Sequence, residues 1–180
     1  MESIYTIAVT GCRRLEKPMI LIALGANLPS AAGPPAATLS SALGRLKECG
    51  ITLLSVSSFY QTPAWPDPSE PPFVNAVASI ATRLQPAELL VLLHDVEAGF
   101  GRVRGAANAA RILDLDLLDY DGRIIVSEVV LPHPRMAERS FVLAPLAEIA
   151  PGWQHPLTRQ GAGELLAGLP DREVPKKLAP

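Results

Sequence analysis

Apolar residues along the chain recur with two periods, about 3.6 residues in some stretches and two residues in others. The helical period occurs in residues 38–49, where Thr38 or Ser40 can cap the first turn and Gly50 follows the last, and again in Gln85–Gly99. Apolar runs and alternating patterns between turn residues predict four further segments as strands, at about 19–25, 51–60, 73–82 and around Asp114–Asp116.

The order of these elements along the chain is strand, helix, strand, strand, helix, strand. This order predicts an α+β protein with the split βαβ, ferredoxin-like (βαββαβ) arrangement. A turn at Asp121-Gly122 and a short strand at Ile124–Val126 follow the core, and two short helices are expected at about 139–149 and 161–169. We therefore expect a ferredoxin-like core with an additional short strand and C-terminal helices.

The stretch Arg111–Leu118 alternates leucines with carboxylates. On a strand its leucines point to one face, and Asp114 and Asp116 point to the other. Two carboxylates about 6–7 Å apart repel by roughly 2–3 kcal/mol at an effective dielectric constant of about 20. A divalent cation removes this cost, and Mg²⁺ prefers one or two carboxylates together with phosphate oxygens. The alternative is a solvated edge strand whose aspartates oppose aggregation.

Three arginines, Arg102, Arg104 and Arg111, precede the aspartates, and no acidic residue lies between the first arginine and Leu113. The planar guanidinium group matches phosphate oxygens with two parallel hydrogen bonds. Arginines followed by paired aspartates favour a polyphosphate held by guanidinium groups on one side and by metal on the other. The alternative is a basic surface that the two aspartates neutralise.

Composition narrows the class of protein without defining its chemistry. A chain of 180 residues with net charge −2 fits one domain and gives no basic surface for nucleic acid. Cys12 and Cys49 form neither a disulfide framework nor a metal-ligand spacing, so a cytoplasmic location is expected. The longest apolar run, Met19–Ala26, is too short to span a membrane. We expect an N-terminal extension over residues 1–18, one catalytic domain over 19–172 and a C-terminal tail over 173–180.

Several ordered motifs between about residues 19 and 150 resemble those of 6-hydroxymethyl-7,8-dihydropterin pyrophosphokinase, an enzyme family of folate synthesis. The motifs in this sequence are Ile20–Asn27, Ser57–Pro63, Phe73–Asn75, Glu97–Arg104, Arg111–Asp116, Leu131–His133 and Arg139–Phe141. The resemblance implies transfer of pyrophosphate from ATP to the pterin, leaving AMP. It implies two Mg²⁺ ions, ATP and a reduced pterin as ligands, and no nucleic-acid or membrane partner. We also expect a monomer.

The resemblance assigns the candidate site residues as follows. Asp114 and Asp116 bind the metal ions, and with Arg102 and Arg111 they form the expected catalytic set. The residues expected to bind ATP are Glu97, Arg102, Arg104, Arg111, Leu117, His133 and Arg139. The residues expected to bind the pterin are Thr62, Pro63, Phe73, Asn75, Asp114 and Phe141.

Without the resemblance, simpler interpretations hold for several of these residues. Phe73 and Phe141 would be core aromatics, Asn75 an amide at a strand edge, His133 a turn histidine and Glu97 a charge on a solvent-facing helix side. Two other classes also fit the charged residues: a metal-dependent nuclease or phosphatase, and a non-catalytic ferredoxin-like binding module. A nuclease or phosphatase does not explain the set Phe73, Asn75 and Phe141, and in a binding module the aspartate pair would be incidental.

The sequence departs from the family pattern before the aspartate motif. Family members often carry an aromatic residue there, usually Trp, whereas residues 105–110 are Gly-Ala-Ala-Asn-Ala-Ala. The proline-rich loop Pro63–Pro72 carries Trp65 instead, and its five prolines restrict the backbone. We therefore expect Trp65 to supply the aromatic cover over the bound ligands.

Overall fold

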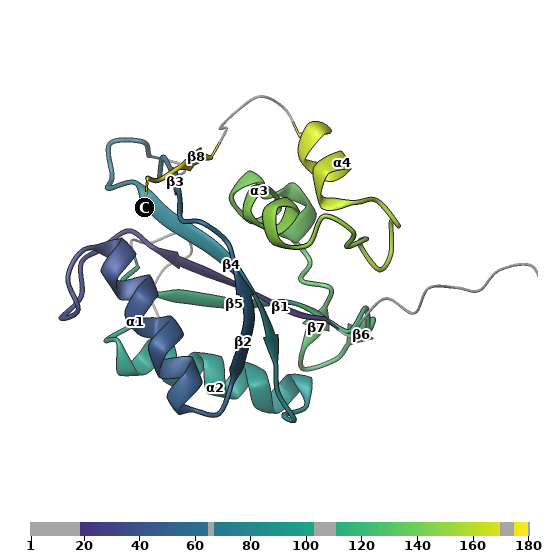
Figure 1. Ribbon diagram of the computed structural model, residues 1–180, viewed down its shortest axis with the longest axis horizontal. Helices are drawn as coiled ribbons and strands as arrows, with labels where there is room; N and C mark the ends of the chain where they lie inside the picture. The colour runs from purple at the N-terminus through teal and green to yellow at the C-terminus, as the bar shows by residue number, and fades with distance from the viewer. Residues whose placement is uncertain (1–18, 65–66, 103–110, 170–174, 180) are drawn as a thin grey trace, which may run out of the picture.

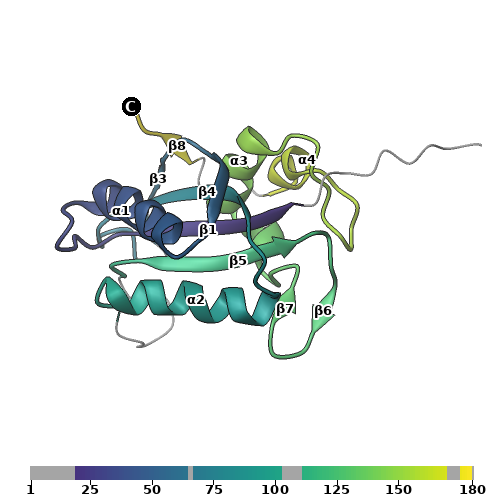
Figure 2. The ribbon, with the colours of Figure 1, turned by 60° about the horizontal axis from the view of Figure 1, so that its bottom comes forward.

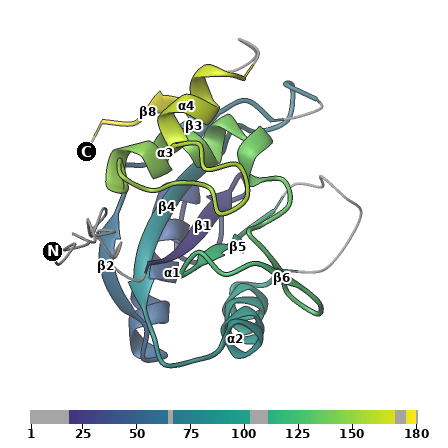
Figure 3. The ribbon, with the colours of Figure 1, turned by 90° about the vertical axis from the view of Figure 1, so that its right-hand side faces the viewer.

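The computed structural model describes residues 19–64, 67–102, 111–169 and 175–179 as a sheet between two helical layers (Figure 1). Helices α1 (Pro35–Glu48) and α2 (Pro86–Gly99) cover one face of the sheet. Helices α3 (Ser140–Ile149) and α4 (Ala162–Ala167) cover the other (Figure 3). The mixed architecture of helices and sheet agrees with the α+β class expected from the sequence. In the part of the chain that the structure describes, no helix is long and apolar enough to cross a membrane.

The main sheet is antiparallel throughout, with the strand order β5-β1-β4-β3-β8 and with β2 paired to β4 as well. Its strands are β1 (Ile20–Ala26), β2 (Thr52–Val56), β3 (Tyr60–Thr62), β4 (Phe73–Ala81), β5 (Asp114–Tyr120) and β8 (Lys176–Lys177). A separate small sheet pairs β6 (Ile125–Val126) with β7 (Val130–Leu131). Strand β8 lies in the segment expected to be a tail.

The single strand expected at 51–60 is divided into β2 and β3, which pair with successive parts of β4. Ser57 occupies the division, where its backbone N–H donates to Val77 O at 2.9 Å. Its side-chain Oγ accepts the Val77 N–H at 3.0 Å. Because this hydroxyl takes the place of a backbone carbonyl, the strand is interrupted without leaving a buried donor unpaired.

The start of α1 differs from the expectation that Thr38 or Ser40 caps it. The helix begins at Pro35 with Pro34 as its N-cap, so the predicted cap is wrong. Proline is favoured at the first helical position because its φ angle is preset and no N–H is lost there. Thr38 lies inside the helix, and its hydroxyl forms a 2.7 Å hydrogen bond with that of Ser30.

Helix α2 begins as expected, with Pro86 in its first turn and Gln85 as N-cap. The Glu88 carboxylate accepts the Gln85 backbone N–H at 2.7 Å, which satisfies a donor at the helix start. The helix lies along β5 (Figure 2), and the C-terminal end of α2 leads toward the start of that strand. A single turn of 3₁₀ helix, η1 (Met136–Glu138), precedes α3.

The alternation of side chains along β1 divides the interior into two cores. Ile20, Ile22 and Leu24 pack under α1 and α2, whereas Leu21 and Ala23 pack under α3. All five side chains are at most 9% exposed, so both faces of this central strand are buried. This burial explains why the strand reads as a continuous apolar run rather than as an alternating one.

Candidate active site

Asp114 and Asp116 lie on the face of β5 opposite the leucines, as the alternating pattern predicts. Leu113, Leu115 and Leu117 are buried in the core beneath α1 and α2. The two carboxylates instead face the α3 side, with side chains 20% and 31% exposed. The aspartate pair is therefore accessible to a ligand while its strand stays anchored by the leucines.

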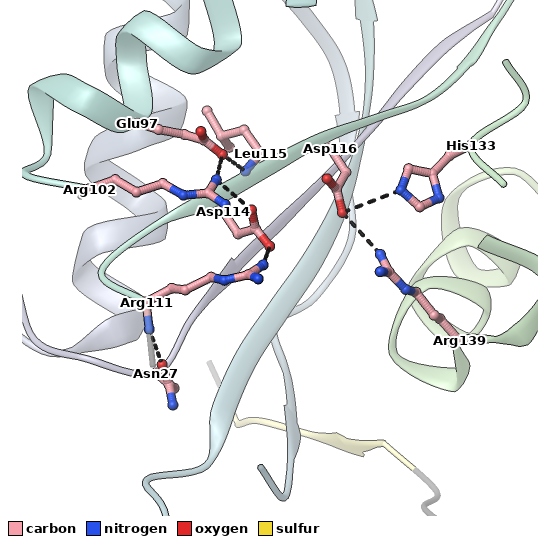
Figure 4. A network of polar contacts seen from close by, with 9 residues as sticks. All are labelled: Asn27, Glu97, Arg102, Arg111, Asp114, Leu115, Asp116, His133 and Arg139. Carbon is pink, nitrogen blue, oxygen red and sulfur yellow. Dashed lines mark hydrogen bonds and ion pairs between the residues drawn. The ribbon is translucent and has the colours of Figure 1, made fainter. Parts of the chain in front are cut away.

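Two arginines neutralise Asp114. The Arg102 guanidinium lies 2.6 Å from Asp114 Oδ1, and the Arg111 guanidinium donates a hydrogen bond to Oδ2 (Figure 4). Arg102 enters from the residues after α2, and Arg111 from the residues before β5. The two arginines and the aspartate expected to act together are thus in direct contact.

Asp116 has its own cationic partner. Arg139 Nη1 donates to Asp116 Oδ2 at 3.1 Å, and His133 Nε2 lies 3.9 Å from the same oxygen. Arg139 is the residue immediately before α3, and His133 follows the small sheet. Burial lowers the pKa of His133 more than the Asp116 charge raises it, so the imidazole is neutral near pH 7.

Glu97 is a buried carboxylate at the end of α2, and not a charge on a solvent-facing side of the helix. Its side chain is 3% exposed, pairs with Arg102 and accepts the Leu115 backbone N–H at 2.6 Å. Desolvation raises its pKa to about 7, despite the lowering effects of the Leu115 hydrogen bond and the Arg102 charge. Glu97 therefore ties the helix end to β5 beside Asp114.

The residues assigned to the pterin come from β3, β4 and α3. Phe73 and Asn75 share the β4 face that carries Val77, which packs under α3. Asn75 Nδ2 donates to Thr62 Oγ1 at 3.0 Å, and both side chains are buried. Phe141 is half-buried in the first turn of α3, with the Arg139 guanidinium 5.5 Å from its ring centroid. Pro63 follows β3 in an exposed position.

Gly25 links the two halves of the site and was not among the predicted site residues. In the sheet it lies opposite Asp114 on one side and Asn75 on the other. A Cβ atom at this position would lie 3.2 Å from Asn75 Oδ1 and 4.0 Å from the Asp114 Cβ. The backbone of β1 thus forms the floor between the aspartate and the amide, where any side chain would occupy space.

Asn27 is a second residue that sequence reasoning did not assign to the site. Its Oδ1 accepts the Arg111 backbone N–H at 2.7 Å, and its Nδ2 donates to Pro71 O at 3.1 Å. The side chain is 3% exposed. Asn27 therefore joins the end of the proline-rich loop to the start of the aspartate motif. The sequence did contain a signal for this residue, because Asn27 is the last residue of the first family-like motif, Ile20–Asn27.

For three of the predicted residues, the structure either gives no description or places the side chain in the core. Arg104 and Trp65 lie outside the residues that the structure describes. Leu117 is buried in the core beneath α1 and α2, so its side chain faces away from Asp116. Only its backbone can contact a ligand on the α3 side of the sheet.

The fold and these contacts define an α+β protein in which Asp114, Asp116 and Asn75 lie on one face of an antiparallel sheet. The sequence model of the family "7,8-dihydro-6-hydroxymethylpterin-pyrophosphokinase (HPPK)" matches residues 21–151. This chain therefore belongs to the HPPK family.

Curated relatives agree with the family assignment. A 2-amino-4-hydroxy-6-hydroxymethyldihydropteridine pyrophosphokinase of Methylorubrum extorquens is 42% identical over 132 residues, covering 72% of this chain and 81% of that protein. The protein of the same name from Haemophilus influenzae is 42% identical over 131 residues, covering 72% and 79%.

Solved structures support the fold. The HPPK-DHPS protein of Plasmodium falciparum matches with a TM-score of 0.64 at 13% identity, over 83% of this chain and 43% of that one. This chain thus spans less than half of that larger protein, and the likeness concerns the fold alone.

Proposed function

We propose that this chain transfers the β,γ-pyrophosphoryl group of ATP to the hydroxymethyl oxygen of 6-hydroxymethyl-7,8-dihydropterin. The hydroxymethyl oxygen forms a bond to the β-phosphorus and loses its proton, and the bond from that phosphorus to the α-phosphate oxygen breaks to release AMP. The family match carries this proposal. The proposal is also supported by the position of Asp114, Gly25 and Asn75 in one row across the sheet. This row brings Asp114, expected to hold the metal and phosphates, close to Asn75, expected to bind the pterin.

The donor set of the aspartates fits Mg²⁺, and we propose that Asp114 and Asp116 hold two such ions. Among the described residues, no group of three or more His, Cys, Asp or Glu side chains could hold a metal by itself. Mg²⁺ does not need such a cage, because it combines one or two carboxylates with waters and phosphate oxygens. When bound, it would neutralise phosphate charge and orient the attacking and leaving oxygens.

The arginines supply the remaining positive charge. Arg102, Arg111 and Arg139 are paired with the two aspartates in this structure. We propose that their guanidinium groups bind phosphate oxygens when ATP enters, where the forked geometry gives two hydrogen bonds per group. Catalysis then comes from positioning and charge stabilisation, with no covalent enzyme intermediate.

His133 is suited to donate one hydrogen bond to the nucleotide. Its Nδ1 accepts the Arg135 backbone N–H at 3.1 Å, so the neutral ring carries its proton on Nε2. Nε2 faces the Asp116 carboxylate (Figure 4), the region proposed for the phosphates. The ring can therefore donate to a phosphate oxygen without itself changing charge.

On the pterin side, the amide of Asn75 is oriented by its neighbours. Since Nδ2 donates to Thr62, Oδ1 points toward Gly25, where it can accept an N–H of the pterin ring. We propose that Phe73 and Phe141 stack on the two faces of the ring and that Thr62 and Pro63 contribute backbone groups. The side chain of Asp114, across Gly25, is near enough to this row to contact the pterin as well.

We also infer that the core is ferredoxin-like. The elements β1, α1, β2, β4, α2 and β5 follow one another as strand, helix, strand, strand, helix, strand. Their antiparallel order in the sheet is β5-β1-β4-β2. This order supports the split βαβ arrangement expected from the sequence.

The test is an AMP-release assay with ATP, Mg²⁺ and 6-hydroxymethyl-7,8-dihydropterin. AMP should appear only when all three are present, in equal amount to the pterin diphosphate. Release of phosphate or ADP without pterin would instead identify a phosphohydrolase. Binding of ATP with no turnover under any condition would identify a binding module.

A further inference from the structure

Glu148, near the C-terminal end of α3, receives hydrogen bonds from two separate strand segments. Its Oε1 accepts the Ser58 backbone N–H at 3.2 Å and the Ser58 hydroxyl at 2.9 Å. Its Oε2 accepts the Tyr60 hydroxyl at 2.8 Å. Lys177, in β8, adds a 3.2 Å ion pair to Oε1. We call Ser58, Tyr60, Glu148 and Lys177 the Glu148 clamp.

The Glu148 clamp is continuous with the proposed pterin site through the sheet. Tyr60 lies opposite Asn75 on one side and opposite Lys177 on the other. The antiparallel partner of Asn75 in β1 is Gly25, so one row runs from the floor of the site to the clamp. A displacement of β3 at Tyr60 would therefore first change the position of Asn75 and its hydrogen bond to Thr62.

Helix α3 is attached at both of its ends. Arg139, which precedes it, donates to Asp116 at 3.1 Å, and Phe141 lies in its first turn. Glu148 attaches the last turn to β3. Between these attachments the helix, which has Pro145 in its interior, packs against β4. The two attachments therefore hold the helix that carries Phe141 against the strand that carries Phe73.

Charge contributes to the Glu148 clamp, although its contacts lie near the surface, where solvent screens them. Desolvation, followed by the nearby Glu148 carboxylate, raises the pKa of Tyr60 to about 12, so the phenol keeps its proton. Desolvation acts to raise the pKa of Glu148, but the hydrogen bonds from Tyr60, Ser58 and Lys177 together outweigh it and lower that pKa. The carboxylate is therefore ionised at neutral pH, and hydrogen bonds to an ionised acceptor are stronger than neutral ones.

We propose that Glu148 is a positioning residue for pterin recognition, and that β8 of the C-terminal segment completes its clamp. By holding α3 to β3, Glu148 sets the separation between Phe141 and the pair Phe73 and Asn75. The inference rests on the proposed function and assigns a role to residues 176–178, where the Leu178 N–H also donates to Phe59 O at 2.8 Å.

The test compares Glu148→Ala and Lys177→Met with wild type in the AMP-release assay. For Glu148→Ala we expect the KM for pterin to rise about tenfold, or about 1.4 kcal/mol. The KM for ATP and kcat should stay within about threefold, because Arg139 keeps its own hydrogen bond to Asp116 and because Arg102 and Arg111 lie outside α3. Lys177→Met should give a smaller rise. Glu148→Gln should restore only part of the affinity, because its amide oxygen can still accept from Ser58 while the charge and one acceptor oxygen are lost.

Glu48→Ala is the matched control, because Glu48 forms an exposed ion pair with Arg45 at the end of α1. It should leave every constant unchanged. A second reading of the same assay is the difference between the two substrates: in Glu148→Ala only the KM for pterin should rise, whereas a general loosening of the fold should raise the KM for ATP as well.

Two results would overturn the inference while leaving the proposed function in place. One is a Glu148→Ala protein whose KM for pterin lies within about twofold of wild type. The other is an equal rise in the KM for ATP and in the KM for pterin. Failure of the proposed function is distinct, since wild type itself would then release no pterin-dependent AMP.

Discussion

Replacing Asn75 by alanine tests the pterin side of the site most directly. The side chain is 5% exposed in the middle of β4. The replacement removes two things: the Oδ1 that points toward Gly25, and the donor to Thr62 Oγ1 at 3.0 Å. The first change should weaken pterin binding, and the second should lower the free energy of unfolding.

The magnitudes follow from burial. A polar pairing lost from a buried ligand edge costs about 1–3 kcal/mol, which raises the dissociation constant for pterin by about 5- to 150-fold. Thr62 is 4% exposed, so its hydroxyl loses a partner where water does not readily replace it. The unfolding free energy should fall by about 1–2 kcal/mol as a result. Affinity for ATP should be unchanged, because Arg102 and Arg111 contact Asp114, which lies across Gly25 from Asn75.

The assay is calorimetric titration of 6-hydroxymethyl-7,8-dihydropterin in the presence of a non-hydrolysable ATP analogue, with separate titration of the analogue. Thr62→Val is the matched control, since it breaks the same internal hydrogen bond but keeps the Asn75 amide. It should lose similar stability and a smaller part of the pterin affinity.

Equal weakening of both ligands in Asn75→Ala would refute the reasoning, because Asn75 would then serve the fold rather than the pterin. A change in pterin affinity of less than about twofold would refute it as well.

Three further predictions concern other parts of the molecule. Asp116→Ala should lower turnover by about 100- to 4,000-fold, because transition-state charge stabilisation of about 3–5 kcal/mol is lost; circular dichroism should show an intact fold, and retention of a tenth of the activity would exclude the metal role. Glu97, whose folded pKa is raised from 4.5 to about 7, should make wild type less stable as pH rises through this interval. The titration of Glu97 should lower the free energy of unfolding by at most about 3 kcal/mol over this pH interval. Denaturant unfolding of Glu97→Gln should show a smaller fall in this free energy with pH. Trp153, buried and donating to Asp119 at 2.7 Å, can be replaced by Phe to isolate Trp65. Tryptophan emission of that variant should change when pterin and an ATP analogue bind together, and a constant emission would place the cover elsewhere.

The sequence was sufficient to predict those features of the fold that follow from a single local rule. The alternation in Arg111–Leu118 correctly separated the leucines from Asp114 and Asp116, because a strand has a period of two. The helix from Pro86 was predicted with its start, since a proline in the first helical turn is a local signal.

Tertiary contacts were not predictable in the same way. The division of the strand at Ser57 depends on the Ser57 hydroxyl, which accepts a hydrogen bond from the Val77 N–H. Strand β8 forms because Lys176 and Lys177 pair with the side of β3 that β4 leaves open. Partners distant along the chain decide each of these cases, and no local pattern names them.

The attachment of Glu97 to β5 has a consequence for solubility. Strand β5 stands at the end of the sheet order, so its outer backbone groups could pair with a strand of another molecule. The Glu97 carboxylate occupies the Leu115 N–H, and the His133 N–H donates to Leu118 O at 2.8 Å on the same strand. The strand that presents the aspartates is therefore closed to edge-to-edge association by residues of its own site. A variant that frees this edge should aggregate on mild heating before its fold is lost.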